Sequence, residues 1–504
     1  QEVGGTGDQY KAFQMKNGVE IYGGFNATET ALIQRNITSN QTILSGNNVS
    51  YHVFNHGNNL ALLPTAILDG FTISGGNANG TGDHNSGGAM LNTSTNDTPG
   101  RSTGSYVTVR NSKFINNTST NGGGAIYNQG RNPSNEKYNG VNLINCTFEN
   151  NSTVAKGGAI WSYRSYLSVD NCTFTDNTVV GASYGGSAIF VEGGYNIPQD
   201  KAVVSNSSFN SNDVTTMASG SDNGGTVYFR LDPGHAEITN CTFTNNTGRY
   251  GSGIFAKTTD VSKANSGLTI TNCSFIGNQS TFAGGIFIDV LDAIVKDCTF
   301  KNNSALSQGG AIYSRGSTNT PKYTNCLLSG NRAESNGGGI YVNGGNPTFT
   351  NLTVAGNLAA ANYGGGFRIL AGAVTFNNSI INNNVGSTGS NCGSILTGAS
   401  AVFNYSLIDE SQIRLEGTGS FTNNNGLAGN PNFIDPLPPT TLNTPNQNGN
   451  YQLLNTSMCL DAGNNALNSE IFDITELTGR KLDKTTGAAG IIDLGAYEHL
   501  ETVQ

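Results

Sequence analysis

The segments N-C-T-F-E-N-N at residues 145–151 and G-G-A-I-W at residues 157–161 form one copy of the phrase that decides the fold. Ten copies occupy residues 111–384, and the position filled by Cys146 recurs at residues 112, 146, 172, 207, 241, 273, 298, 326, 352 and 379. Successive copies therefore begin between 25 and 35 residues apart. A recurrence of this length indicates a solenoid, in which each repeat packs only on its neighbours.

Each repeat predicts short strands instead of helices. Apolar residues alternate with polar ones, as in Leu167-x-Val169 and Cys172-x-Phe174, and no segment keeps a period of 3.6 residues. The shortest repeats leave no room for a helix in every coil. We therefore predict an all-β fold, a single parallel β-helix with three short strands per coil. It is expected to run from about residue 15 to beyond residue 410 and to end in a C-terminal cap.

Three columns of the repeat have structural explanations. We expect the phenylalanine column to fill the core, the asparagine column to bond between neighbouring coils at a bend, and the Gly-Gly pair to supply positive φ or close backbone approach. The phenylalanine column is Phe114, Phe148, Phe174, Phe209, Phe243, Phe275 and Phe300. The asparagine column is Asn117, Asn151, Asn177, Asn212, Asn246, Asn278, Asn303, Asn331, Asn357 and Asn384.

Six of the eight cysteines share one column of the repeat: Cys146, Cys172, Cys241, Cys273, Cys298 and Cys326. Side chains that stack in parallel suit the dihedral angle of a disulfide poorly, so we predict buried free thiols. The chain has no Cys-x-x-Cys spacing and no His pair of the kind that zinc sites use, and we expect neither a metal nor a cofactor.

Composition limits the partners. Charged residues make up 12% of the chain, the net charge is −9, and no basic run offers a phosphate-binding stripe, which argues against nucleic-acid binding. No apolar stretch is long enough to span a membrane. We divide the chain into N-terminal coils with an insertion (1–110), regular repeats (111–390), and last coils with the C-terminal cap (391–504).

The phrase resembles the repeats of chlamydial polymorphic outer-membrane proteins and of secreted bacterial right-handed parallel β-helix proteins. K-N-G-V-E-I-Y-G-G-F at residues 16–25 is similar to the opening of surface proteins of the choice-of-anchor type. N-P-N-F at 430–433, C-L-D-A-G at 459–463 and I-D-L-G-A-Y-E at 492–498 are similar to their ends. The resemblance implies a right-handed β-helix that is secreted, extracellular or on the cell surface. Such proteins usually carry further segments before and after, so we expect one processed unit of a longer surface protein.

Three functions compete. The first is a non-catalytic adhesin or structural rod with a glycan or cell-surface partner, and the second is a subunit of an extracellular filament that associates end to end. The third is a polysaccharide lyase or glycoside hydrolase, which would need clustered carboxylates beside a basic residue. Its candidates are Asp289, Asp292, Lys296, Asp297, Arg315 and Lys322. A solvated charged face is the simpler explanation of those residues, so we predict no catalytic residue and no enzyme activity.

An aromatic column is the candidate binding stripe. It consists of the residue after the isoleucine of each Gly-Gly phrase: Tyr127, Trp161, Phe190, Tyr228, Phe255, Phe287, Tyr313 and Tyr341. The residue two positions further on is mostly polar, so strand alternation predicts that the rings point outward. Outward rings either stack between coils and lie under the long inserts at 129–140 and 192–201, or bind glycans or a partner surface.

Overall fold

The structure is a computed structural model. It describes residues 7–57, 60–93, 104–130, 139–181, 184–193, 201–214, 224–232, 234–258, 266–290, 292–386, 390–437, 448–475 and 490–499. These residues form two compact units. The amino-terminal unit lies within residues 1–241, 246–249 and 257–266, and the carboxy-terminal unit lies within 242–245, 250–256 and 267–504. Domain boundaries at residues 110 and 390 stay a prediction from the sequence.

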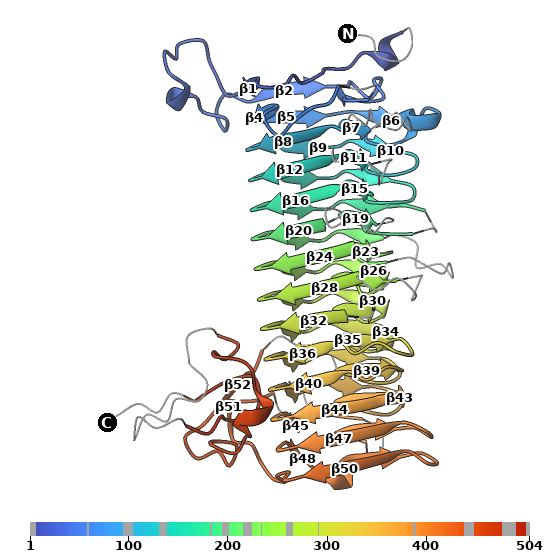
Figure 1. Ribbon diagram of the computed structural model, residues 1–504, viewed down its shortest axis with the longest axis vertical. Helices are drawn as coiled ribbons and strands as arrows, with labels where there is room; N and C mark the ends of the chain where they lie inside the picture. Colours follow the sequence, from blue (N-terminus) through green and yellow to red (C-terminus); the bar gives the residue numbers. More distant parts are fainter. Residues whose placement is uncertain are drawn as a thin grey trace. The chain divides into compact units, whose positions relative to one another are not determined.

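Both units are built from four parallel sheets, named first to fourth in the order in which the chain visits them (Figure 1). In the amino-terminal unit the first sheet contains β1 (Glu20–Tyr22), β4 (Ile67–Asp69), β8 (Tyr106–Arg110), β12 (Gly140–Ile144), β16 (Tyr166–Asp170), β20 (Lys201–Ser205) and β24 (Gly234–Thr239). The second contains β2 (Thr42–Ser45), β5 (Phe71–Ser74), β9 (Lys113–Ile115), β13 (Thr147–Glu149), β17 (Thr173–Thr175) and β21 (Ser208–Asn210). The third contains β6 (Asn77–Ala78), β10 (Thr118–Ser119), β14 (Ser152–Thr153), β18 (Thr178–Val179), β22 (Asp213–Val214) and β26 (Thr247–Tyr250). The fourth contains β3 (Phe54–Asn55), β7 (Met90–Thr93), β11 (Ile126–Gln129), β15 (Ile160–Tyr163), β19 (Ile189–Glu192) and β23 (Val227–Arg230).

The carboxy-terminal unit repeats this arrangement and adds one antiparallel hairpin. Its first sheet contains β28 (Ser266–Thr271), β32 (Asp292–Lys296), β36 (Lys322–Thr324), β40 (Thr348–Thr350), β44 (Ala373–Asn377), β47 (Ser400–Asn404) and β50 (Ser420–Asn424). The second contains β25 (Thr242–Thr244), β29 (Ser274–Ile276), β33 (Thr299–Lys301), β37 (Leu327–Ser329), β41 (Thr353–Ala355), β45 (Ile380–Asn382) and β48 (Leu407–Ile408). The third contains β30 (Gln279–Phe282), β34 (Ser304–Gln308), β38 (Arg332–Ala333) and β42 (Leu358–Ala359). The fourth contains β27 (Ile254–Lys257), β31 (Ile286–Asp289), β35 (Ile312–Arg315), β39 (Ile340–Asn343), β43 (Phe367–Ala371), β46 (Gly393–Ile395) and β49 (Ile413–Leu415). The hairpin pairs β51 (Phe433–Asp435) with β52 (Asn450–Leu453).

The predicted all-β parallel β-helix is therefore confirmed, with one difference in the coil. A full coil has four strands instead of three, because the two or more residues after the asparagine bend also pair with their neighbours, as Ser119 does with Thr153. The helices within the described residues are short 3-10 turns: η1 (Asp8–Tyr10), η2 (Leu32–Gln34), η3 (Gly82–Asn85), η4 (Glu410–Gln412) and η6 (Asn465–Leu467).

The phenylalanine and asparagine columns lie where the sequence predicts them. Phe148 and Phe174 are fully buried, and their rings stack with centroids 4.7 Å apart and an interplanar angle of 4°. The buried Asn177 side chain donates from Nδ2 to the Phe148 carbonyl at 2.9 Å and to Asn212 Oδ1 at 3.0 Å. The same pattern recurs in the carboxy-terminal unit, for example from Asn303 to Asn331 at 2.9 Å. Each coil is thus joined to the next by aromatic stacking and by a buried amide ladder.

Two corners of the coil use left-handed backbone. The asparagine that opens each phrase has a positive φ, as at Asn145 (54°) and Asn171 (51°), a conformation that asparagine tolerates better than most residues. The residue three positions before the isoleucine of the phrase also has a positive φ, as at Gly157 (64°) and Gly186 (72°). A Cβ on Gly158 would lie 2.0 Å from the Ser187 carbonyl oxygen of the next coil, so Gly158 allows a close backbone approach in its coil.

All eight cysteines are free and buried, as predicted for the six in the column. Burial raises the pKa of Cys146 and Cys298 well above its ordinary value and raises the pKa of Cys392 to about 12. We therefore expect the native protein at pH 8 to react with no more than a trace of iodoacetamide, and the protein in denaturant without reductant to react at all eight thiols. Mass spectrometry counts the modified sites, and disulfide-linked peptides would contradict this.

The described residues of the C-terminal segment, 433–437, 448–475 and 490–499, pack beside the coils instead of over their end, which corrects the predicted cap. Residues from Phe433 to Ala496 form a buried cluster with outward residues of the second sheet, among them Leu327, Ile380 and Leu407. Figure 1 shows β51 and β52, in red, beside these coils. The segment also follows the asparagine corners: Asn378 Nδ2 donates to the Asn464 carbonyl at 3.2 Å, Asn351 to Asn468 Oδ1 at 2.7 Å, and Asn325 to the Phe472 carbonyl at 2.9 Å. Apolar outward side chains make this lateral packing favourable.

Candidate functional site

The aromatic column is buried, so the expectation that a binding stripe of exposed rings lies here is wrong. No ring in the column exposes more than 6% of its residue surface; the members are Tyr127, Trp161, Phe190, Tyr228, Phe255, Phe287, Tyr313 and Tyr341. Neighbours pack on each other: the Tyr127 and Trp161 centroids are 4.4 Å apart, and those of Phe287 and Tyr313 are also 4.4 Å apart. The stacking between coils that the sequence offered as the simpler explanation is present. The inserts fall largely on residues 131–138 and 194–200, outside the described residues.

Local cations and loop residues cover these rings. The Lys156 ammonium lies 4.6 Å from the Trp161 ring centroid, 4.5 Å from that of Tyr184 and 5.6 Å from that of Phe190. It also pairs with Glu192 at 3.1 Å. Strand alternation predicts the side of a sheet that a ring occupies, but it does not predict what covers the ring.

The charged residues proposed for a polysaccharide lyase are engaged with one another. Arg315 Nη2 lies 2.6 Å from Asp289 Oδ2. Lys296 Nζ lies 2.5 Å from Glu470 of the C-terminal segment and 3.5 Å from Asp297. Burial raises the pKa of Asp297, which accepts a hydrogen bond from Asn325 at 2.9 Å. Lys322 is exposed, and the Asp292 side chain is outside the described residues. Asp289 and Arg315 are therefore held in an ion pair with each other, and Lys296 is held in an ion pair with the docked C-terminal segment.

Incubation of the protein with acidic polysaccharides and calcium is expected to release neither unsaturated nor reducing-end products. The Asp289 carboxylate is already paired with Arg315, so it is poorly placed to hold calcium or to take a proton from a sugar. Absorbance of unsaturated uronates and a reducing-sugar assay measure this directly. Activity that disappears in Asp289→Ala and persists in Glu334→Ala, a partly exposed carboxylate paired with Arg332, would establish the enzyme hypothesis.

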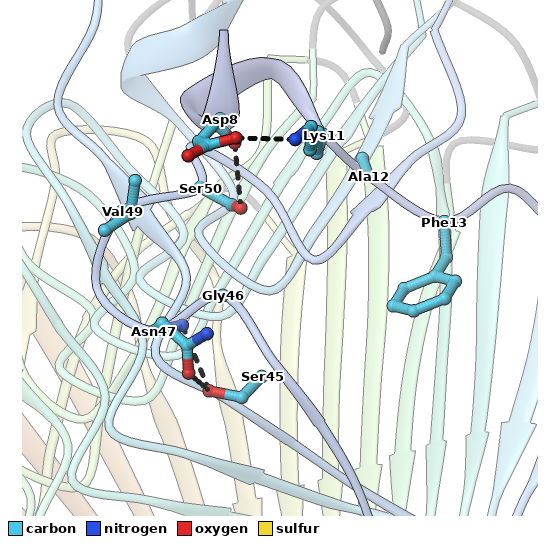
Figure 2. A pocket seen from close by; sticks show the side chains of 9 residues that line it. All are labelled: Asp8, Lys11, Ala12, Phe13, Ser45, Gly46, Asn47, Val49 and Ser50. Atoms are coloured by element: carbon cyan, nitrogen blue, oxygen red, sulfur yellow. Dashed lines mark hydrogen bonds and ion pairs between the residues drawn. The ribbon is translucent and has the colours of Figure 1, made fainter. Parts of the chain in front are cut away.

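A pocket of about 400 Å³ opens at the first coils of the amino-terminal unit. Figure 2 shows that η1 and the residues after it form one wall and the corner after β2 forms the other. The lining residues are Asp8, Lys11, Ala12, Phe13, Ser45, Gly46, Asn47, Val49 and Ser50. No sequence motif marks this pocket, since its lining residues belong to two separate segments of the irregular N-terminal coils.

Buried histidines hold the wall formed by residues 8–15. His56 donates from Nδ1 to Asn92 Oδ1 at 2.7 Å, and its Nε2 accepts from the Met15 amide at 3.3 Å. His52 donates from Nδ1 to the Gly87 carbonyl at 2.8 Å and contacts His84 Nδ1 through Nε2 at 3.1 Å. The Tyr10 ring of η1 lies 5.2 Å from the His84 ring. These histidines are scattered in the sequence. They meet only in the folded protein, where the coils and the insertion that carries His84 bring them together.

Acidification is expected to release this wall. Burial lowers the pKa of His52 to about 3 and of His56 to about 4, below the ordinary 6.5. Between pH 6.5 and those values the unfolded segment binds protons that the folded one does not. The contribution of the two neutral imidazoles to the free energy of unfolding is therefore fully present above pH 6.5. It falls by about 1.4 kcal/mol per pH unit for each imidazole as the pH decreases from 6.5 toward the pKa of the folded state. Among the described residues, Asp83 raises the pKa of His84 against the effect of burial.

Hydrogen exchange of residues 8–15 at pH 7 and pH 4.5 measures the effect. We expect the protection factors, in which each observed rate is divided into the intrinsic rate at the same pH, to be lower at pH 4.5 than at pH 7 in the wild type, with a weaker pH dependence in His56→Gln. His235 is exposed, so His235→Gln is the matched control and is expected to behave as the wild type. Equal protection factors at both pH values in the wild type would contradict the role of the histidines.

The comparisons with known proteins agree with the fold. Residues 134–326 match the right handed beta helix region family, and residues 111–129 and 325–343 match the Chlamydia polymorphic membrane protein repeat. The predicted resemblance to right-handed β-helix proteins with such repeats is thus confirmed. No curated protein matches the chain.

One solved structure with a similar chain is tailspike protein 3 of bacteriophage CBA120. The identity is 12% and the TM-score 0.38, over 73% of this chain and 55% of the tailspike chain, so this chain matches about half of the tailspike. None of the helices in the described part of the chain is long and apolar enough to cross a membrane.

Proposed function

We propose that this chain is a non-catalytic, surface-displayed β-helix protein that acts as an adhesin or a structural rod. The observation that carries the proposal is the division of roles within a coil. Inward positions repeat the same residue type, as Phe148, Phe174 and Phe209 do, whereas the outward positions beside them change between Lys113, Thr147, Thr173 and Ser208. The inward columns stabilise the coils, and the outward faces remain available for recognition. The similarity to polymorphic membrane protein repeats supports display at a surface.

Two measurements test the proposal. Antibody labelling of intact cells that produce the chain should detect it without permeabilisation. Beads coated with the full chain should adhere to epithelial monolayers or polysaccharide-coated surfaces in a saturable manner, and an excess of soluble chain should block adhesion. Labelling without adhesion would favour the structural rod, and signal only after permeabilisation would contradict surface display.

An extracellular filament is the second candidate, and a specific observation favours it. In the first coil, β1 pairs with β4 and β2 pairs with β5, and neither pairs with another described strand. Apolar side chains near these edges are exposed, among them Ile33, Ile43 and Val49. Open edges with exposed apolar residues promote strand pairing between molecules.

Negative-stain images and light scattering across a concentration series separate the two candidates. A filament subunit should lengthen with concentration, and a Lys in place of Ile43 should prevent this. The exposed Ile471 lies in the C-terminal segment, so Ile471→Lys is the control. Discrete particles of constant mass would exclude the filament.

A further inference from the structure

We propose that the pocket at the first coils binds one ring of a neutral saccharide. This inference rests on the proposed adhesin function and names the ligand class of one site. It starts from the pocket between residues 8–13 and residues 45–50, whose volume of about 400 Å³ lies in the range of small-molecule sites.

One side of the pocket is apolar. Phe13 exposes 52% of its surface, and its ring centroid lies 5.7 Å from that of the buried Phe54, which supports it from behind. Backbone hydrogen bonds between Phe13 and Val53 (2.8 Å) and between Asn55 and Phe13 (3.0 Å) fix its position along the edge of β3. Val49 is exposed to the same extent on the opposite wall. A rigid aromatic surface of this kind can pack on the C–H face of a pyranose ring.

The rim supplies hydrogen-bonding groups at fixed positions. Asn47 Oδ1 accepts from Ser45 Oγ at 3.1 Å, and the Asn47 amide lies at the edge of the pocket (Figure 2). Asn47 and Asn48 both have a positive φ, 52° and 58°, and bonds such as Asn48 N to the Gly75 carbonyl at 2.8 Å hold this turn. Asparagine tolerates this left-handed backbone, so the turn holds the Asn47 side chain at a fixed position on the rim.

The charged groups that line the pocket, Asp8 and Lys11, favour a neutral ligand. Lys11 Nζ lies 2.6 Å from Asp8 Oδ1, and the hydrogen bond from Lys11 lowers the pKa of Asp8, so the carboxylate is ionised at neutral pH. The two opposite charges cancel, and the second carboxylate oxygen remains an acceptor for a hydroxyl group. An apolar side chain from another molecule would desolvate this carboxylate and the Asn47 amide without bonding to them, which is unfavourable. A saccharide offers both a C–H face and hydroxyl groups.

Titration of the full chain with methyl α-mannoside, methyl β-glucoside, methyl β-galactoside and N-acetylglucosamine, followed by saturation-transfer NMR, tests the inference. At least one glycoside is expected to bind saturably with a Kd of about 1 to 10 mM, typical of a single exposed ring. Phe13→Ala should weaken binding at least tenfold. Asn47→Gly, which keeps the backbone conformation, should weaken it by a factor of about five. Phe25 is 40% exposed in the same coils and does not line the pocket, so Phe25→Ala is expected to bind as the wild type.

Three results would overturn the inference. The first is that no glycoside binds at about 50 mM, which is roughly five times the weakest expected Kd. The second is unchanged binding in Phe13→Ala, and the third is a molecular mass that increases with protein concentration in the wild type and not in Phe13→Ala. The last result would assign the pocket to a second copy of the chain. The bead assay, run in parallel, separates the two proposals. If the wild type and Phe13→Ala both adhere and neither binds a glycoside, the saccharide pocket is rejected and the adhesin function is kept. If the wild type binds a glycoside and does not adhere, the adhesin function is rejected and the saccharide pocket is kept.

Discussion

Replacing Asn177 by alanine is expected to lower the free energy of unfolding of the amino-terminal unit by about 3 to 5 kcal/mol. The side chain is fully buried and makes four ladder hydrogen bonds. Its Oδ1 accepts from the Asn151 amide at 3.1 Å and from Asn151 Nδ2 at 3.0 Å, and its Nδ2 donates to the Phe148 carbonyl and to Asn212. Truncation leaves buried donors and acceptors without partners, and this penalty exceeds the value of any one hydrogen bond.

Urea unfolding followed by tryptophan fluorescence measures the loss, because Trp161 is the single tryptophan and lies in the same unit. The matched control is Asn145→Gly in the neighbouring coil. Asn145 is exposed, its Nδ2 bonds Asn111 Oδ1 at 2.7 Å, and glycine tolerates its φ of 54°. We expect that variant to lose less than about 1 kcal/mol. Equal losses in the two variants would mean that the buried ladder is not a principal source of stability.

Placing an aspartate at Leu494 is expected to detach the C-terminal segment from the coils, with a loss of about 3 to 5 kcal/mol in its docking free energy. Leu494 is 1% exposed in the cluster with Leu327, Ile380 and Leu407. Its backbone amide bonds the Cys459 carbonyl at 3.0 Å, and the next residue, Gly495, bonds the Asn378 carbonyl at 2.8 Å. A charge at this position would be buried without a partner.

Hydrogen exchange and limited proteolysis of residues 464–473 report the detachment. Ile491 is three residues earlier and 51% exposed, so Ile491→Asp adds the same charge outside the cluster and should leave both readouts unchanged. Protection of residues 464–473 that survives Leu494→Asp would show that the asparagine corners alone retain the segment.

The sequence predicted the interior of the coils well because each inward column is repeated. Phe148, Asn151 and Gly157 face the same surroundings in every coil, so their residue type reports those surroundings. The outward features were predicted less well. The aromatic column is buried, and Lys156 lies over two of its rings, Trp161 and Phe190. No periodic pattern in the sequence encodes that cover.

The lateral docking of the C-terminal segment left a signal in the sequence that the cap prediction did not use. Outward positions of the second sheet change from Thr147 and Thr173 to Leu327, Ile380 and Leu407. Apolar residues on an outward face require a covering segment. The pocket at the first coils and the pair formed by His52 and His84 left no comparable signal, because the segments that build them are far apart in the chain and do not repeat.

The central claim is that each repeat forms one coil, so that equivalent residues of successive repeats are neighbours. Spin labels on cysteines introduced at Lys113 and Thr173 test it most directly. Both residues are exposed, and each pairs with Thr147 from opposite sides, which places them two coils or roughly 10 Å apart. The buried native thiols should not take up label without denaturant. The account predicts strong dipolar broadening in the doubly labelled protein, and a spectrum equal to the sum of the two single labels would contradict it.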